Sequence, residues 1–169
     1  MKRTVLVFGL IAGGIMTAMM MALVPFADRI GFDRSVIIGY TTIVIGFLMI
    51  FFGIRSYREN VGAGKISFGR GLAIGLLITL IASLIYAVVW QFVYFNFMPD
   101  FLDKYAQHVA DKARAAGASA EAIQAQMKEM QDFKTWYSNP LFNLAVTIWE
   151  PLPVGLIISF VSALVLRKR

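Results

Sequence analysis

Between Arg70 and Asp100 the chain reads GLAIGLLITLIASLIYAVVWQFVYFNFMP (residues 71–99), a stretch of 29 residues without Asp, Glu, Lys or Arg. At about 1.5 Å per residue, a helix of this length extends roughly 43 Å. The hydrocarbon core of a bilayer is only about 30 Å thick. The stretch therefore predicts a membrane-spanning helix over about 70–97, which is tilted in the bilayer or projects beyond one face.

One face of this predicted helix carries small side chains at every fourth position, and positions i and i+4 share a face. Small residues let neighbouring membrane helices approach closely, so the pattern predicts a packing face. A second interpretation is a path or cleft lined by Thr79, Ser83 and Tyr86. The small positions are Gly71, Gly75, Thr79, Ser83 and Ala87.

The composition indicates a single integral membrane domain over residues 1–169. The chain is 59% hydrophobic and its mean hydropathy is +0.70, whereas soluble domains are about 45–50% apolar. The absence of Cys excludes disulfides and cysteine nucleophiles, and the single His108 excludes a multi-histidine metal site within one chain. The net charge of +6 is typical of basic residues at the cytoplasmic ends of spans. No polar segment combines a basic stripe with aromatic residues, so nucleic acid is not an expected partner.

Three further apolar stretches predict spans at about 4–26, 35–54 and 141–166. The first follows Met1-Lys2-Arg3, as the core of a secretory signal peptide does. Its length, and Pro25 three residues before the one plausible cleavage site, favour a retained span. Small residues recur along these spans too, at Gly9, Gly13 and Thr17, at Gly39, Gly46 and Gly53, and at Gly155, Ser159 and Ala163. The sequence therefore predicts one close-packed bundle of four helices.

The polar segment at about 99–137 predicts a helical hairpin between the third and fourth spans. Its helices are expected at about 100–116 and 120–136, with Gly117 ending the first and Ser119 capping the second. Both have apolar residues at three- and four-residue spacing, which is typical of amphipathic helices. These apolar stripes must pack on each other, on the bilayer surface or on a partner.

The fourth span is interrupted by Trp149-Glu150-Pro151-Leu152-Pro153. Proline cannot donate a backbone hydrogen bond, so carbonyls of the preceding turn lose helical partners. Because lipid tolerates such groups only inside protein or beside a wet cavity, we expect Glu150 to face the bundle interior, hydrogen-bonded to another span. The alternatives are a helix-end acid that meets water, and a binding or proton-sensitive site. The predicted polar cluster is Glu150, Tyr86, Gln91, Tyr94 and Trp149.

The distribution of basic residues predicts the orientation. Four spans place both termini on one side, together with the loop at 55–70, and Lys and Arg are concentrated there over short lengths. The positive-inside rule places that side in the cytoplasm and the hairpin in the periplasm or exterior.

Three stretches carry a resemblance to a known family. They are Tyr57-Arg58 followed by residues 64–69 (GKISFG), then Pro99-Asp100-Phe101, and Asn139-Pro140-Leu141 followed by residues 150–155 (EPLPVG). With them the chain resembles a family of small four-span bacterial inner-membrane proteins catalogued as a domain of unknown function. The resemblance implies four helices with a periplasmic insertion before the last, and it implies no activity, cofactor or catalytic residue.

The sequence predicts a non-enzymatic membrane protein with no cofactor. Its expected partners are the lipid bilayer and either a second copy of itself or another membrane protein. One alternative is an oligomeric transporter, channel or lipid-handling protein with a site at the broken fourth span. Another is an intramembrane enzyme that uses Glu150 and His108.

Overall fold

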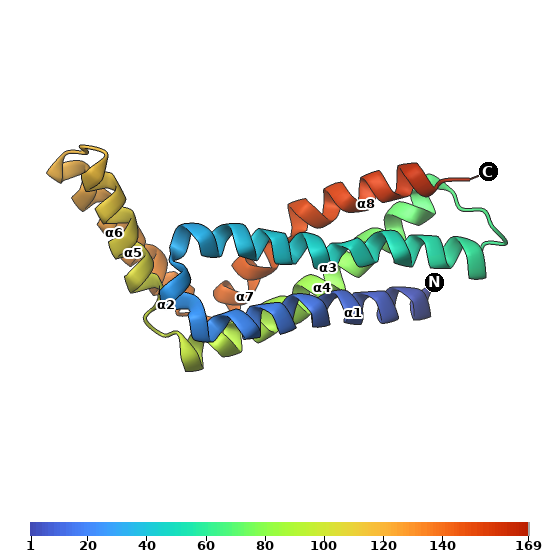
Figure 1. Cartoon of the computed structure of the whole chain (residues 1–169), viewed down its shortest axis with the longest axis horizontal. Coiled ribbons are helices and arrows are strands. Elements are labelled where there is room, and N and C mark those ends of the chain that lie inside the picture. Colours follow the sequence, from blue (N-terminus) through green and yellow to red (C-terminus); the bar gives the residue numbers. More distant parts are fainter. Residues whose placement is uncertain (169) are drawn as a thin grey trace. The chain divides into compact units, whose positions relative to one another are not determined.

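Helices make up the protein (Figure 1). The computed structural model describes residues 1–168, apart from the side chain of Asp28, and Arg169 of the predicted basic end lies outside the described residues. In chain order the elements are α1 (Lys2–Leu23), the 3-10 helix η1 (Val24–Phe26), α2 (Ala27–Ile30), α3 (Phe32–Asn60), α4 (Phe68–Phe97), α5 (Phe101–Ala115), α6 (Ala120–Tyr137), α7 (Pro140–Trp149) and α8 (Leu152–Leu166).

Four helical stretches are long and apolar enough to cross a membrane, namely Lys2–Phe26, Phe32–Asn60, Phe68–Phe97 and Pro140–Leu166. Residues 1–168 contain no β-sheet, only an isolated bridge. The predicted all-α fold with four spans and a helical hairpin is therefore confirmed. The second helix is longer than the predicted 35–54, since Asp33 lies in its first turn and Arg58 in its last, where the helix dipole favours those charges.

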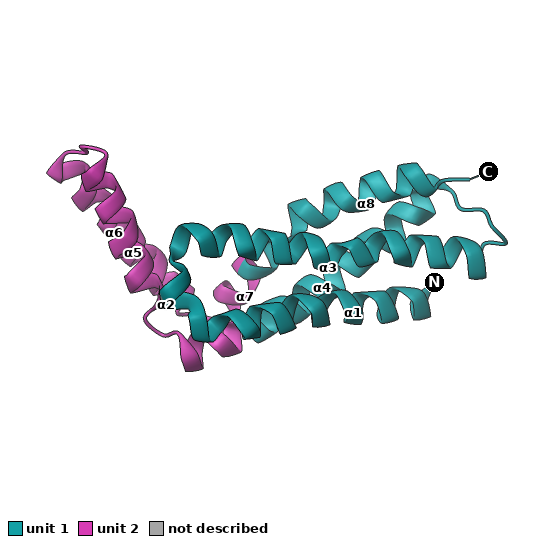
Figure 2. Cartoon of the chain, viewed as in Figure 1, with its two compact units in different colours: residues 1–89, 147–169 teal, residues 90–146 magenta. Residues whose placement is uncertain are grey.

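The chain forms two compact units, residues 1–89 with 147–169, and residues 90–146 (Figure 2). The core of the first unit contains large apolar side chains that are fully buried between the helices. Lipid tails are as apolar as these side chains, so close van der Waals packing between helices is what stabilises such a bundle in a membrane. They include Met16, Ile43, Phe47, Ile50, Ile54, Ile74 and Ile78.

Close contact between α4 and α8 depends on the absence of side chains at three glycines. A methyl group on Gly75 would lie 2.7 Å from Ser159 Cβ, and one on Gly155 would lie 2.2 Å from Thr79 Cγ2. One on Gly71 would lie 3.3 Å from Ala163 Cβ. The two helices are antiparallel and in close contact along this row.

Helix α1 packs on the same bundle through two further glycines. Methyl groups on Gly9 and Gly13 would each lie 2.9 Å from the Cβ of an isoleucine of α4, Ile81 and Ile85 respectively. The neighbouring Gly14 has open space beside it. Glycines of one helix therefore differ sharply in what they contact.

The second unit contains the hairpin formed by α5 and α6, which is held by an aromatic cluster and an ion pair. Tyr94, Leu102 and Tyr137 are buried together. Lys134 Nζ lies 2.7 Å from Asp103 Oδ2 and joins the two helices. Ser119 caps α6, since its Oγ accepts a hydrogen bond from the backbone N–H of Ala122.

Candidate functional site

The break in the fourth span lies between α7, which ends at Trp149, and α8, which begins at Leu152. Pro151 is fully buried, whereas Glu150 and Trp149 are exposed. Glu150 and Pro151 themselves form a turn between the two helices. Within residues 1–168 no hydrogen bond or ion pair holds the Glu150 carboxylate. The hydrogen bond that was expected between Glu150 and another span is therefore not found among the described residues.

The other members of the predicted polar cluster have separate surroundings. Tyr86 is partly buried and packs against the core of the first unit. Gln91 and Tyr94 have their contacts within the second unit, where Gln91 Nε2 donates to the Pro140 carbonyl at 2.6 Å. The Tyr94 ring is 3% exposed and meets the Tyr137 ring edge-on, with centroids 5.2 Å apart. These contacts give Gln91 and Tyr94 structural roles.

The predicted packing residues line the inside of the first unit. All six, Gly71, Gly75, Thr79, Ser83, Gly155 and Ser159, are buried. Thr79 Oγ1 donates to the Gly75 carbonyl at 3.0 Å and lies 3.4 Å from Ser159 Oγ. These two hydroxyls therefore place a polar contact inside the α4–α8 interface.

Several buried polar residues were missed by the sequence reasoning. They are Thr42, Thr147 and Ser162 in the first unit and Asn143 in the second. The Asn143 carboxamide lies within an apolar stretch of the sequence, and lipid-facing positions disfavour such a polar side chain. Its position in the sequence was therefore the signal for a buried residue. No group of three or more His, Asp or Glu side chains able to hold a metal ion occurs among the described residues.

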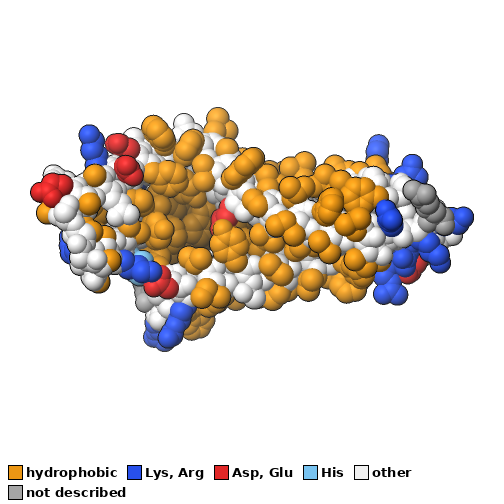
Figure 3. Space-filling view, turned by 90° about the horizontal axis from the view of Figure 1, so that it is seen from above, with side chains coloured by type: hydrophobic (Ala, Val, Ile, Leu, Met, Phe, Trp, Pro, Cys, Tyr) orange, Lys and Arg blue, Asp and Glu red, His pale blue; other side chains and the backbone are white. Residues whose placement is uncertain are grey.

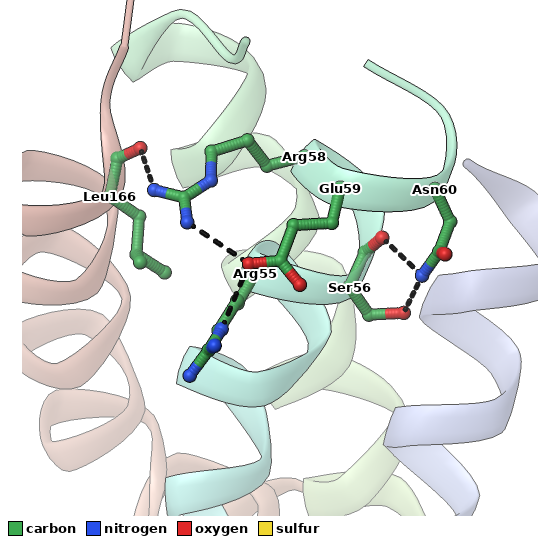
Figure 4. Close-up of polar contacts among 6 residues, drawn as sticks. All are labelled: Arg55, Ser56, Arg58, Glu59, Asn60 and Leu166. Atoms are coloured by element: carbon green, nitrogen blue, oxygen red, sulfur yellow. Dashed lines mark hydrogen bonds and ion pairs between the residues drawn. The ribbon is translucent and has the colours of Figure 1, made fainter. Parts of the chain in front are cut away.

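A second polar cluster closes the end of the first unit that carries the chain termini (Figure 4). Glu59 accepts hydrogen bonds from Arg55 Nε at 3.0 Å and from an Arg58 nitrogen at 3.2 Å. Arg58 also donates to the Leu166 carbonyl at 3.3 Å. One arginine thereby joins the last turn of α3 to the last turn of α8.

The loop between α3 and α4 is held in one conformation next to this cluster. Ala63 and Gly64 have φ values of 49° and 81°, a region that favours glycine. A methyl group on Gly62 would lie 2.1 Å from the Lys65 carbonyl oxygen. Two backbone hydrogen bonds of 3.0 Å pair Ile66 with Lys168. The predicted basic loop is therefore an ordered structure tied to the C-terminal segment.

Comparison with known proteins gives one match. The model of the family described as "Protein of unknown function (DUF4199)" matches residues 7–168. No curated protein and no solved structure matches the chain. The matched residues include most of the first apolar helix, the other three, the hairpin and the break in the last helix. The chain has four helices long and apolar enough to cross a membrane, and it belongs to this family of proteins of unknown function.

Proposed function

We propose that this protein is a non-enzymatic membrane component that binds a partner protein through the hairpin of α5 and α6. The observation that carries the proposal is an ordered polar hairpin on a chain whose other long helices are apolar. Helices α5 and α6 expose most of their charged side chains. Ordering such an element before binding lowers the entropy cost of association.

Local contacts support a hairpin that keeps its shape. Besides the aromatic cluster and the Asp103–Lys134 ion pair, Lys104 Nζ lies 3.0 Å from Asp100 Oδ2 in the first turn of α5. This hydrogen bond holds the pKa of the Asp100 carboxyl below its ordinary value. At Gly117 the φ of +78° permits the turn between the two helices. The hairpin therefore offers a fixed charged surface.

The partner would be reached from the periplasm, with the protein in a bacterial inner membrane and its termini in the cytoplasm. Lys and Arg side chains gather at the end of the first unit that holds the termini and the 61–67 loop, as Figure 3 shows at its right. The middle of that unit is covered with hydrophobic side chains (Figure 3). The end of a set of spans that carries more Lys and Arg usually lies on the cytoplasmic side of the membrane.

Reporter fusions test this orientation. A fusion after Arg169 is expected to report the cytoplasm, and an insertion at Gly117, in the turn of the hairpin, is expected to report the periplasm. Gly117 has open space beside it, so the insertion leaves the packing intact. The opposite pair of results would refute the proposed orientation.

Site-specific photocrosslinking tests the partner. A photoreactive residue at Gln124, which is exposed on α6, is expected to give an adduct at native expression, whereas one at Leu84, which is exposed on α4, serves as the lipid-facing control. Adducts at Leu84 alone would assign binding to the bundle. No adduct at either position, with a monomer in mild detergent, would count against partner binding.

The broken fourth span favours a second candidate, an oligomeric transporter, channel or lipid-handling protein. Transporters commonly place sites where a helix is interrupted, and Glu150 stands at such an interruption without a partner in residues 1–168. Flux into liposomes containing the wild type, with loss of that flux in Glu150→Gln, would favour this candidate. Equal leakage from empty and protein-containing liposomes would dismiss it.

A further inference from the structure

The Ser83 hydroxyl is completely buried inside the first unit, and it has no hydrogen-bond partner within the described residues. A serine inside a membrane helix ordinarily donates to a backbone carbonyl of its own helix, as Thr79 does toward Gly75. A buried hydroxyl that lacks a partner destabilises the fold, and native structures usually satisfy it, often with ordered water. Ser83 therefore requires an explanation.

The register of α4 against α8 gives the position of Ser83 relative to the break. Gly71 meets Ala163, Gly75 meets Ser159, and Thr79 meets Gly155. Each advance of four residues along α4 thus moves the contact four residues back along the last span. The next advance places Ser83 at the level of Pro151, which is also fully buried.

The break is also where the backbone is expected to lack helical hydrogen-bond partners. Pro151 and Pro153 have no N–H, so the end of α7 loses two intrahelical donors. The first N–H groups of α8 also lack intrahelical acceptors, although Gly155 N–H donates to the Pro151 carbonyl at 3.0 Å. Lipid cannot satisfy such groups. We therefore expect the break to offer both donors and acceptors at the level of Ser83.

We propose that the buried Ser83 hydroxyl and the open backbone groups at the α7–α8 break form a binding site for a water molecule inside the first unit. Water both donates and accepts hydrogen bonds, so one molecule satisfies the hydroxyl and the backbone together. Such a site accounts for an interruption of the last apolar helix inside the bundle. It does not depend on the proposed partner binding.

A double-mutant cycle tests the site through the melting temperature in mild detergent. Ser83→Ala removes one partner of the water, and we expect the melting temperature to fall by roughly 2–4 °C. Pro151→Ala restores a backbone donor at the break. In that background, Ser83→Ala is expected to cost clearly less, because the two residues act on one site.

Thr41→Val is the matched control, since Thr41 is exposed and its hydroxyl donates to the Ile37 carbonyl at 2.7 Å. Its effect is expected to add to that of Pro151→Ala. A rise in the melting temperature of Ser83→Ala would mean that the wild-type hydroxyl has no hydrogen-bond partner, not even water. That result would overturn the proposal. Additive effects of Ser83→Ala and Pro151→Ala would overturn it too. Stabilisation of the wild type by NaCl but not by choline chloride would assign the site to a cation instead.

Discussion

Replacement of Gly75 by leucine tests the packing of α4 against α8 directly. Gly75 is buried, and a methyl group there would lie 2.7 Å from both Ser159 Cβ and Ser159 Oγ, and 3.1 Å from Ile50 Cγ2. Favourable carbon–carbon contacts lie at about 3.5–4.0 Å. Even alanine therefore requires one helix to shift by roughly 1 Å, and leucine requires more.

The expected loss of stability follows from these contacts. Overpacking a well-packed interface costs about 1–3 kcal/mol, and leucine lies toward or beyond the upper end because Ser159 and Ile50 lie on two different helices. Replacing glycine within a helix returns up to about 1 kcal/mol of helix propensity. A net loss of about 2 kcal/mol corresponds to a fall in melting temperature of roughly 4–8 °C for a chain of this size.

Thermal unfolding in mild detergent measures this effect. Gly69→Leu is the matched control on the same helix, since Gly69 has open space beside it, and its melting temperature is expected to stay within a few degrees of the wild type. An unchanged melting temperature in Gly75→Leu would mean that the row of small residues faces lipid. That result would refute the reasoning for the whole α4–α8 interface.

Four further variants extend these tests, three by the same melting experiment and one by proteolysis. Gly13→Ala is expected to lower the melting temperature and Gly14→Ala to leave or raise it, because only the first meets an isoleucine, at 2.9 Å; equal effects would contradict this packing of α1. Glu150→Gln is expected not to lower the melting temperature, since no described side chain holds the carboxylate; a fall of several degrees would reveal such a partner. Asp103→Asn removes the ion pair between α5 and α6. This change is expected to destabilise the hairpin by about 0.2–1 kcal/mol, which would be measured as faster proteolysis within the hairpin.

Local sequence was sufficient to predict the elements of this fold. The length of an uncharged stretch decides whether a helix can cross a bilayer, and residues 71–99 meet that condition without any tertiary contact. Likewise, Gly117 and Ser119 act on the backbone within a few residues, and they end one helix and begin the next. Pro151 and Pro153 interrupt the last span by removing their own N–H groups.

Which residues meet across the bundle was decided only by the tertiary structure. Gly13 and Gly14 are adjacent and chemically identical, yet one lies against Ile85 and the other beside open space. In the same way, the side chain of Pro151 is buried at the break, whereas that of its neighbour Glu150 is exposed. Periodicity identifies residues that share a face of a helix, but the neighbour of that face depends on how distant helices pack. The sequence by itself therefore determined the spans, the hairpin and the break, and helix packing determined the surroundings of each polar group.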